Sequence, residues 1–170
     1  MDTSGSPFTL LLRVRFCECD AQKVVFNSKY GEYADVAMTE FLRAAVGGYD
    51  KLLAAGIDTQ VVRLTTDFNS PARFDDVLAI SVHTSTIGNT SFILAMEMKH
   101  HPSGRLVGTT TVTYVMVTAS EHQKMRVPED IRELLTKGAP GTVVNQAGQV
   151  SQAPVKTPAP PPVSATTTAV

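Results

Sequence analysis

One carboxylate, Asp20, occupies a position in this chain that suggests chemistry. It lies between a segment with strand-like alternation and a segment with helical spacing, with no histidine or serine partner nearby. A carboxylate in such a place can attack a carbonyl carbon or activate a water molecule. The structural alternative is a turn former or a helix N-cap. Because Asp20 lies well ahead of the helical spacing, Asn27 or Ser28 is the better candidate for the cap.

Two acids within the predicted helix are fallback catalytic candidates. Glu32 and Asp35 lie on or near its polar side, where a solvated or interface charge is the ordinary interpretation. The chain has four histidines, and none falls in this helix or in the loop before it. They show neither triad nor metal-ligand spacing, and no Gly-rich phosphate loop is present. We therefore expect no metal and no redox cofactor. The histidines are His83, His100, His101 and His122.

The composition indicates one soluble domain. The chain has 170 residues, 43% of them hydrophobic, and a net charge of -1, which allows a sizeable core. A chain so close to neutral lacks the basic surface of a dedicated nucleic-acid binder. Cys17 and Cys19 have poor spacing for a disulfide and are too few for a structural zinc, so we expect reduced thiols and a cytoplasmic protein. The N-terminal segment is too short and too charged for a signal peptide or a membrane span.

The composition changes after Lys137. From residue 138 to residue 170 the chain has no aromatic residue and no Leu, Ile or Met. Such a segment cannot bury enough apolar surface to offset the entropy lost on ordering. We therefore expect a domain over residues 1–137 and a flexible Pro/Ala/Thr-rich tail over residues 138–170.

Before that tail, the elements follow in the order strand, helix and then a run of strands. Residues 8–17 alternate, with Leu12, Val14 and Phe16 on one face. From residue 27 to residue 46 the spacing is helical, and Gly47-Gly48 ends the helix. The apolar stripe of this helix consists of Tyr30, Tyr33, Ala34, Ala37, Met38, Phe41 and Ala45.

Further strands and two short helices complete the predicted domain. One long helix can bury its stripe only by lying across the apolar face of the strands. We therefore predict an α+β hotdog fold, an antiparallel β-sheet wrapped around one long central α-helix. On the first of the later strands, Val62, Leu64 and Phe68 share one face. The predicted strands cover residues 59–69, 76–87, 91–99 and 105–117, with a hairpin at Gly88-Asn89, and the short helices cover residues 49–55 and 128–137.

Two stretches of the sequence form a pair of family landmarks. The first runs from Asp20 through VVF and Tyr30 to EFLR at residues 40–43. The second, DFNSPARFDDVLAISV, spans residues 67–82. In order and in predicted secondary structure, they resemble the 4-hydroxybenzoyl-CoA thioesterase family, including its YbgC-like acyl-CoA thioesterase branch. The similarity covers about residues 8–135.

This resemblance implies an acyl-CoA thioesterase. It implies that Asp20 acts as nucleophile or general base and that the backbone N–H of Asn27, at the helix start, stabilises the oxyanion. Phe26, Tyr30 and Phe68 are the expected substrate-binding residues, although Tyr30 and Phe68 fit a core position as well as an acyl pocket. The implied partners are an acyl-CoA, whose CoA belongs to the substrate, and further copies of the chain. Dimers would join edge strands into one sheet with active sites at the interface, and tetramers could follow; neither nucleic acid nor a membrane is expected.

Two other functions are compatible with the predicted fold. A hotdog hydratase or dehydratase would need a histidine beside an acid near the central helix, which this chain lacks. A non-catalytic acyl-CoA-binding or interaction module is the other alternative. Hotdog regulators carry a DNA-binding segment before the domain, and we expect none here because only a few residues precede the first strand.

Overall fold

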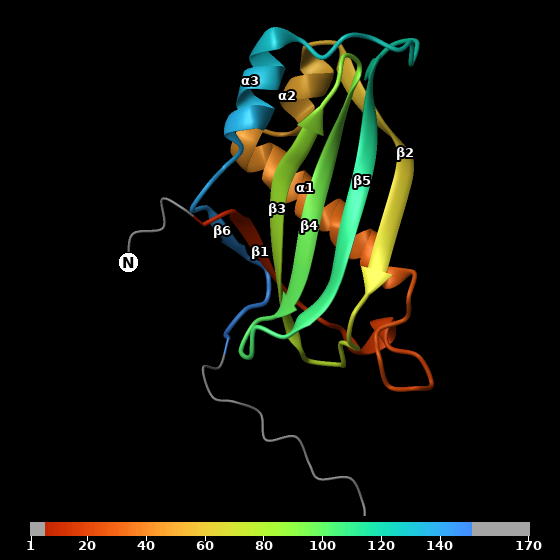
Figure 1. Ribbon diagram of the computed structural model, residues 1–170, viewed down its shortest axis with the longest axis vertical. Helices are drawn as coiled ribbons and strands as arrows, with labels where there is room; N and C mark the ends of the chain where they lie inside the picture. The colour runs from red at the N-terminus through yellow and green to blue at the C-terminus, as the bar shows by residue number, and fades with distance from the viewer. Residues whose placement is uncertain (1–5, 151–170) are drawn as a thin grey trace, which may run out of the picture.

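Six strands form one sheet, and one long helix crosses a face of that sheet (Figure 1). The computed structural model describes residues 6–150. The strand order is β2-β5-β4-β3-β1-β6, and all neighbouring pairs are antiparallel except β1 and β6. The strands are β1 (Phe8–Arg13), β2 (Ile57–Phe68), β3 (Val77–Ile87), β4 (Ser91–His100), β5 (Leu106–Thr118) and β6 (Val143–Asn145). The helices are the 3-10 turn η1 (Phe16–Glu18), α1 (Lys29–Val46), α2 (Tyr49–Ala54) and α3 (Glu129–Lys137).

The central strands β3 and β4 follow the alternation predicted from the sequence. Every second side chain is buried along β4 and along the first half of β3, up to Val82, as expected for a sheet covered on one face. The two strands pair in register, with Ile80 opposite Met98 and Val82 opposite Met96. The buried set comprises Leu78, Ile80, Val82, Phe92, Leu94, Met96 and Met98.

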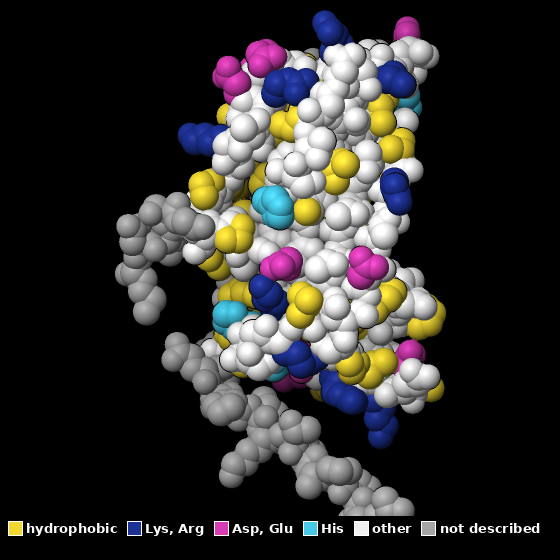
Figure 2. Space-filling view, in the orientation of Figure 1, with side chains coloured by type: hydrophobic (Ala, Val, Ile, Leu, Met, Phe, Trp, Pro, Cys, Tyr) yellow, Lys and Arg dark blue, Asp and Glu magenta, His cyan; other side chains and the backbone are white. Residues whose placement is uncertain are grey.

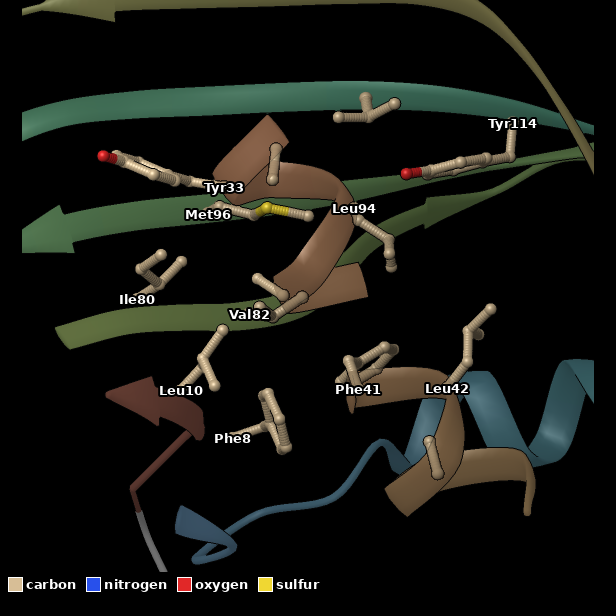
Figure 3. Packing of buried hydrophobic residues seen from close by; sticks show 14 of the residues in the cluster. Phe8, Leu10, Tyr33, Phe41, Leu42, Ile80, Val82, Leu94, Met96 and Tyr114 are labelled. Carbon is tan, nitrogen blue, oxygen red and sulfur yellow. The ribbon is translucent and has the colours of Figure 1, made fainter. Parts of the chain in front are cut away.

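Helix α1 supplies the other half of the core. Phe41 packs edge-to-face on Phe8 of β1, with ring centroids 5.7 Å apart, and Figure 3 shows these rings beside Leu10 and Leu42. The helix ends at Gly47, whose φ of 89° is the left-handed conformation predicted for this glycine. A helix across the apolar face of the sheet matches the predicted hotdog arrangement.

The prediction that Phe16 lies on the buried face of the first strand is wrong. Strand β1 ends at Arg13, and the 3-10 turn η1 follows. Because a turn breaks the alternation of a strand, Phe16 is 79% exposed, whereas Val14 is only 1% exposed.

Edge strand β2 also differs from the prediction in its burial. Its apolar residues Val62, Leu64 and Phe68 are all exposed in the single chain. Strand β2 pairs with β5 on one side only, and a β-bulge between Val61 and Arg63 shifts its register. An edge with exposed apolar side chains is available for pairing with another strand.

The structure differs from the predicted tail at residues 143–145, which form β6 along the edge of β1. Backbone hydrogen bonds hold this segment rather than large apolar side chains, so its composition gave little sign of it. The guanidinium of Arg13 also binds the carbonyl of Ala147 at 2.9 Å. Residues 138–150 of the predicted tail are described by the structure, whereas residues 151–170 lie outside the described residues. Within residues 6–150, no helix is long and apolar enough to cross a membrane.

Candidate active site

The connection between β1 and α1 contains the residues selected from the sequence, at the lower end of the molecule in Figure 1. It folds back on itself as a short hairpin, in which the N–H of Asp20 donates to the carbonyl of Val24 at 3.0 Å. The N–H of Val25 donates to the carbonyl of Ala72 at 2.9 Å, which ties the hairpin to the connection between β2 and β3. The two sequence landmarks therefore meet at this end.

A buried acid, Glu18, anchors the hairpin to α1. Its carboxylate is fully enclosed and accepts hydrogen bonds from the hydroxyl of Tyr33 at 2.8 Å and from the N–H of Arg15 at 2.6 Å. The guanidinium Nε of Arg15 donates to the other carboxylate oxygen at 2.8 Å. On the backbone, the carbonyl of Glu18 accepts the N–H of Phe26 at 2.9 Å. One residue thus joins both arms of the hairpin to the helix.

The ionisation of Glu18 follows from these contacts. Burial alone raises the pKa of its carboxyl group, but the hydrogen bonds from Arg15 and Tyr33 outweigh burial, so its pKa is lowered. Burial and the negative partner raise the pKa of the Tyr33 hydroxyl, which therefore stays protonated as a donor. Breaking such a buried and fully bonded charge is costly, so Glu18 stabilises this end of the fold.

Asp20 is half-buried and takes part in a turn. Its Oδ1 accepts the N–H of Gln22 at 2.7 Å, and its carbonyl accepts the N–H of Lys23 at 2.9 Å. Lys23 has a φ of 62°, a left-handed conformation that costs a lysine more than a glycine. The turn role considered for Asp20 is therefore present. Its other oxygen, Oδ2, has no hydrogen-bond donor within residues 6–150 and can contact a ligand.

The start of α1 leaves two backbone donors unused. The N–H groups of Lys29, Tyr30 and Gly31 donate to carbonyls three residues earlier, at 2.9, 3.4 and 3.3 Å. The N–H groups of Asn27 and Ser28 have no acceptor within the described part of the chain. Ser28 occupies the N-cap position, as one of the two candidates predicted, but its side chain makes no cap hydrogen bond. The helix start thus presents free N–H groups and the positive end of the helix dipole.

Two separate hollows flank the hairpin. Asn27 lies in one of about 310 Å³, and Asp20 lies in the other, of about 450 Å³. Within one chain the two candidate catalytic groups therefore do not line a common hollow, although the same short hairpin holds both. The first hollow is lined by Val25, Asn27, Tyr30, Phe68, Asn69, Ser70 and Pro71. The second is lined by Phe16, Cys19, Asp20, Ala21, Lys23 and Phe74.

The three predicted substrate-binding residues are placed differently from one another. Tyr30 is buried in the core, and its ring packs edge-to-face on that of Phe68, with centroids 5.1 Å apart. Phe68 is exposed, and both rings line the hollow beside Asn27. Phe26 is exposed and lines neither hollow.

The fallback acids lie on α1 and point to solvent. Glu32 pairs with Lys29 at 2.6 Å, and Asp35 is exposed. Neither lines either of the two hollows. Within residues 6–150, no three His, Cys, Asp or Glu side chains form a group that could hold a metal ion.

Comparison with known proteins identifies the family of this chain. Residues 14–135 match the family model described as the Thioesterase-like superfamily. The chain belongs to this superfamily. The match covers the hairpin, α1, strands β2 to β5 and most of α3. It confirms the predicted family and the predicted enzyme class, a thioester hydrolase.

Individual members of the superfamily show the same similarity. The chain is 26% identical over 120 residues to the acyl-CoA thioester hydrolase YbgC of Escherichia coli O157:H7, covering 71% of this chain and 89% of YbgC. A thioesterase superfamily structure from Jannaschia sp. CCS1 superposes with a TM-score of 0.74 at 22% identity, covering 82% of this chain and 98% of that one. The 1,4-dihydroxy-2-naphthoyl-CoA thioesterase Slr0204 from Synechocystis superposes with a TM-score of 0.69 at 18% identity, covering 76% and 96%. These structures confirm the hotdog fold.

Sequence reasoning missed the anchoring role of Glu18 and the second hollow. In the sequence, Glu18 lies two residues before Asp20, and no local pattern marks it as buried. The available signal was Arg15 three residues earlier, at a spacing that allows an ion pair. Phe16 was assigned to the core, so its place in the wall of the hollow beside Asp20 could not be anticipated.

Proposed function

We propose that this member of the Thioesterase-like superfamily hydrolyses acyl-CoA thioesters to the free acid and CoA. The observation that carries the proposal is the start of α1, where the N–H of Asn27 is free and a carboxylate, Asp20, lies on the adjoining hairpin. Asp20 is the nucleophile or general base, and the N–H of Asn27 stabilises the negative charge on the thioester oxygen.

Hydrolysis can proceed by two routes, which differ in whether Asp20 acts as a general base or as a nucleophile. As general base, Asp20 takes a proton from water, the hydroxide adds to the carbonyl carbon, the C–S bond breaks, and the proton passes to the CoA thiolate. As nucleophile, Asp20 forms an acyl-aspartyl anhydride with release of the thiolate, and water then hydrolyses the anhydride. Both routes place negative charge on the same oxygen, so both use the helix start.

A second copy of the chain completes the site in this proposal. The exposed apolar residues of β2 support association of two copies edge to edge. Phe68 lies at the end of β2 and lines the hollow beside Asn27, so a partner paired along β2 would border that hollow. The opposite edge of the sheet is occupied by the short strand β6, which pairs with β1.

The decisive experiment measures release of free thiol from a panel of acyl-CoAs, from acetyl to palmitoyl and including benzoyl. We expect Asp20→Asn to lower kcat by about 10²- to 10⁴-fold, the usual contribution of a general base. Glu32→Gln and Asp35→Asn are the matched controls and should retain activity. If Asp20→Asn stays within a few-fold of the wild type while a control loses activity, the carboxylate assignment is wrong. If no thioester in the panel is cleaved, the non-catalytic binding alternative is favoured.

A further inference from the structure

The groove beside Asp20 has an apolar wall that the proposed chemistry does not require. Phe16 and Phe74 are 79% and 56% exposed, and their rings meet edge-to-face with centroids 5.7 Å apart. Large aromatic side chains are seldom left in water as a pair, and such exposure marks binding surfaces. Figure 2 shows hydrophobic side chains exposed at this lower end of the molecule, next to several Lys and Arg side chains.

The size of this groove suits a small organic group. Its volume is about 450 Å³, within the usual range of about 300–1,000 Å³ for ligand pockets. Asp20 lines this groove. When the carbonyl carbon of the thioester lies within reach of the Asp20 carboxylate, one of the two groups attached to that carbon therefore lies in the groove. That substituent is either the acyl group or the pantetheine arm of CoA.

The chemistry of the two hollows distinguishes these substituents. A pantetheine arm carries amide groups, which need hydrogen-bond partners when they leave water. The hollow beside Asn27 offers the side-chain amides of Asn27 and Asn69. In the groove, the walls are the rings of Phe16 and Phe74 with Ala21 and Cys19, which offer almost no such partners.

We propose that the groove between Phe16 and Phe74 binds the acyl group of the substrate, and that these two phenylalanines determine which acyl groups are accepted. The proposal rests on the proposed role of Asp20. It differs from the expectation that Tyr30 and Phe68 line the acyl pocket, because in this proposal those residues line the hollow beside Asn27, where the pantetheine arm binds. The single cation that lines the groove, Lys23, is exposed and has no acidic partner within salt-bridge distance in the described chain.

The test compares acyl groups of different size in the wild-type chain and in Phe16→Ala and Phe74→Ala. Since each ring is already exposed, its removal leaves the fold intact. We expect kcat/KM for hexanoyl-CoA to fall about tenfold in each variant, with acetyl-CoA changed less than about threefold, since hydrophobic pocket contacts discriminate on this scale. Ala21→Phe, which fills the groove, should reject hexanoyl-CoA and keep acetyl-CoA. Leu53→Ala, an exposed apolar residue on α2 at the other end of the molecule, is the matched control.

A binding measurement separates this proposal from the proposed function. S-hexyl-CoA, a thioether that cannot be hydrolysed, and CoA itself are titrated calorimetrically into each variant. Tighter binding of S-hexyl-CoA than of CoA, reduced by Phe16→Ala and Phe74→Ala, supports the acyl site even if no thioester is cleaved. Equal losses for acetyl-CoA and hexanoyl-CoA would assign the groove to the CoA moiety and overturn the proposal. A change of oligomeric state without a change of acyl preference would mean that a second copy occupies the groove, which also overturns it.

Discussion

Two of the buried tyrosines, Tyr33 and Tyr114, allow one test in which the same substitution should have opposite effects. The hydroxyl of Tyr33 donates to the Glu18 carboxylate at 2.8 Å. The hydroxyl of Tyr114 is also buried, but it has no hydrogen-bond partner within residues 6–150. Figure 3 shows both rings in the same core, on α1 and on β5. Replacing each tyrosine by phenylalanine removes one oxygen atom and leaves the ring in place.

The expected magnitudes follow from the partners of each hydroxyl. A hydrogen bond to a charged acceptor contributes about 1.5–3 kcal/mol, and Glu18 keeps its contacts with Arg15, so Tyr33→Phe should lower the free energy of unfolding by about that amount. An unsatisfied buried hydroxyl costs about 1–3 kcal/mol, so Tyr114→Phe should raise the free energy of unfolding by up to that amount. The stacking of Tyr114 on Phe92, with centroids 5.1 Å apart, is preserved.

Urea denaturation at neutral pH measures both values on one scale. The midpoint should fall for Tyr33→Phe and rise for Tyr114→Phe, with equal m-values showing that the unfolding transition is the same. If both variants lose stability equally, the environments of the two hydroxyls do not differ as described. In that case the anchoring role of Glu18 would lose its main support.

Three other predictions test the acid, the sheet and the free edge. Because the pKa of Glu18 is lowered, its contribution to stability is complete above its ordinary value of about 4.5 and is lost as the pH falls through the lower folded-state pKa. Glu18→Gln should therefore be less stable than the wild type at pH 7. The difference between the two urea midpoints should shrink as the pH is lowered. Gly108→Ala would place a Cβ 2.8 Å from the carbonyl oxygen of Asp67 and should lower the free energy of unfolding by about 1–3 kcal/mol. The Cβ added by Gly31→Ala would have its nearest contact at 3.7 Å, so this variant in α1 should raise the free energy of unfolding by up to about 1 kcal/mol. Thermal unfolding measures both changes. Leu64→Asp on β2 should reduce self-association measured by light scattering, and a monomeric wild type would contradict the proposed edge pairing.

The sheet and the long helix could be predicted because their signals are periodic. In β4, Phe92, Leu94, Met96 and Met98 recur at every second position, and all four are buried as predicted. In α1, Gly47 adopts the left-handed conformation that its position after the helical stripe requires. These signals depend only on neighbours in the sequence, which explains why they were reliable.

The errors arose where distant parts of the chain decide burial. Phe16 continues the alternation of β1, but the 3-10 turn begins at this residue and turns its ring outward. Leu64 has the pattern of a core residue, yet β2 lies at the edge of the sheet, where a single chain provides no cover. Strand β6 is only three residues long, too short for an apolar pattern to show, and it pairs with β1 through main-chain hydrogen bonds while Val144 packs against the core. Neither strand order nor a backbone partner can be deduced from local composition.

The candidate site depends on two acids of similar type that differ in their surroundings. Glu18 and Asp20 flank the extended residue Cys19; the Glu18 carboxylate is buried in the core, whereas Asp20 lines a hollow. Glu18 is fully bonded and cannot exchange partners without loss of stability, whereas Asp20 uses one oxygen in a turn and keeps Oδ2 without a donor in residues 6–150. A rigid acid that fixes the hairpin to α1 also fixes the position of Asp20, the acid proposed to react, relative to the helix start. This arrangement would let one carboxylate work without a histidine, because the anchor supplies the orientation that a triad partner provides elsewhere.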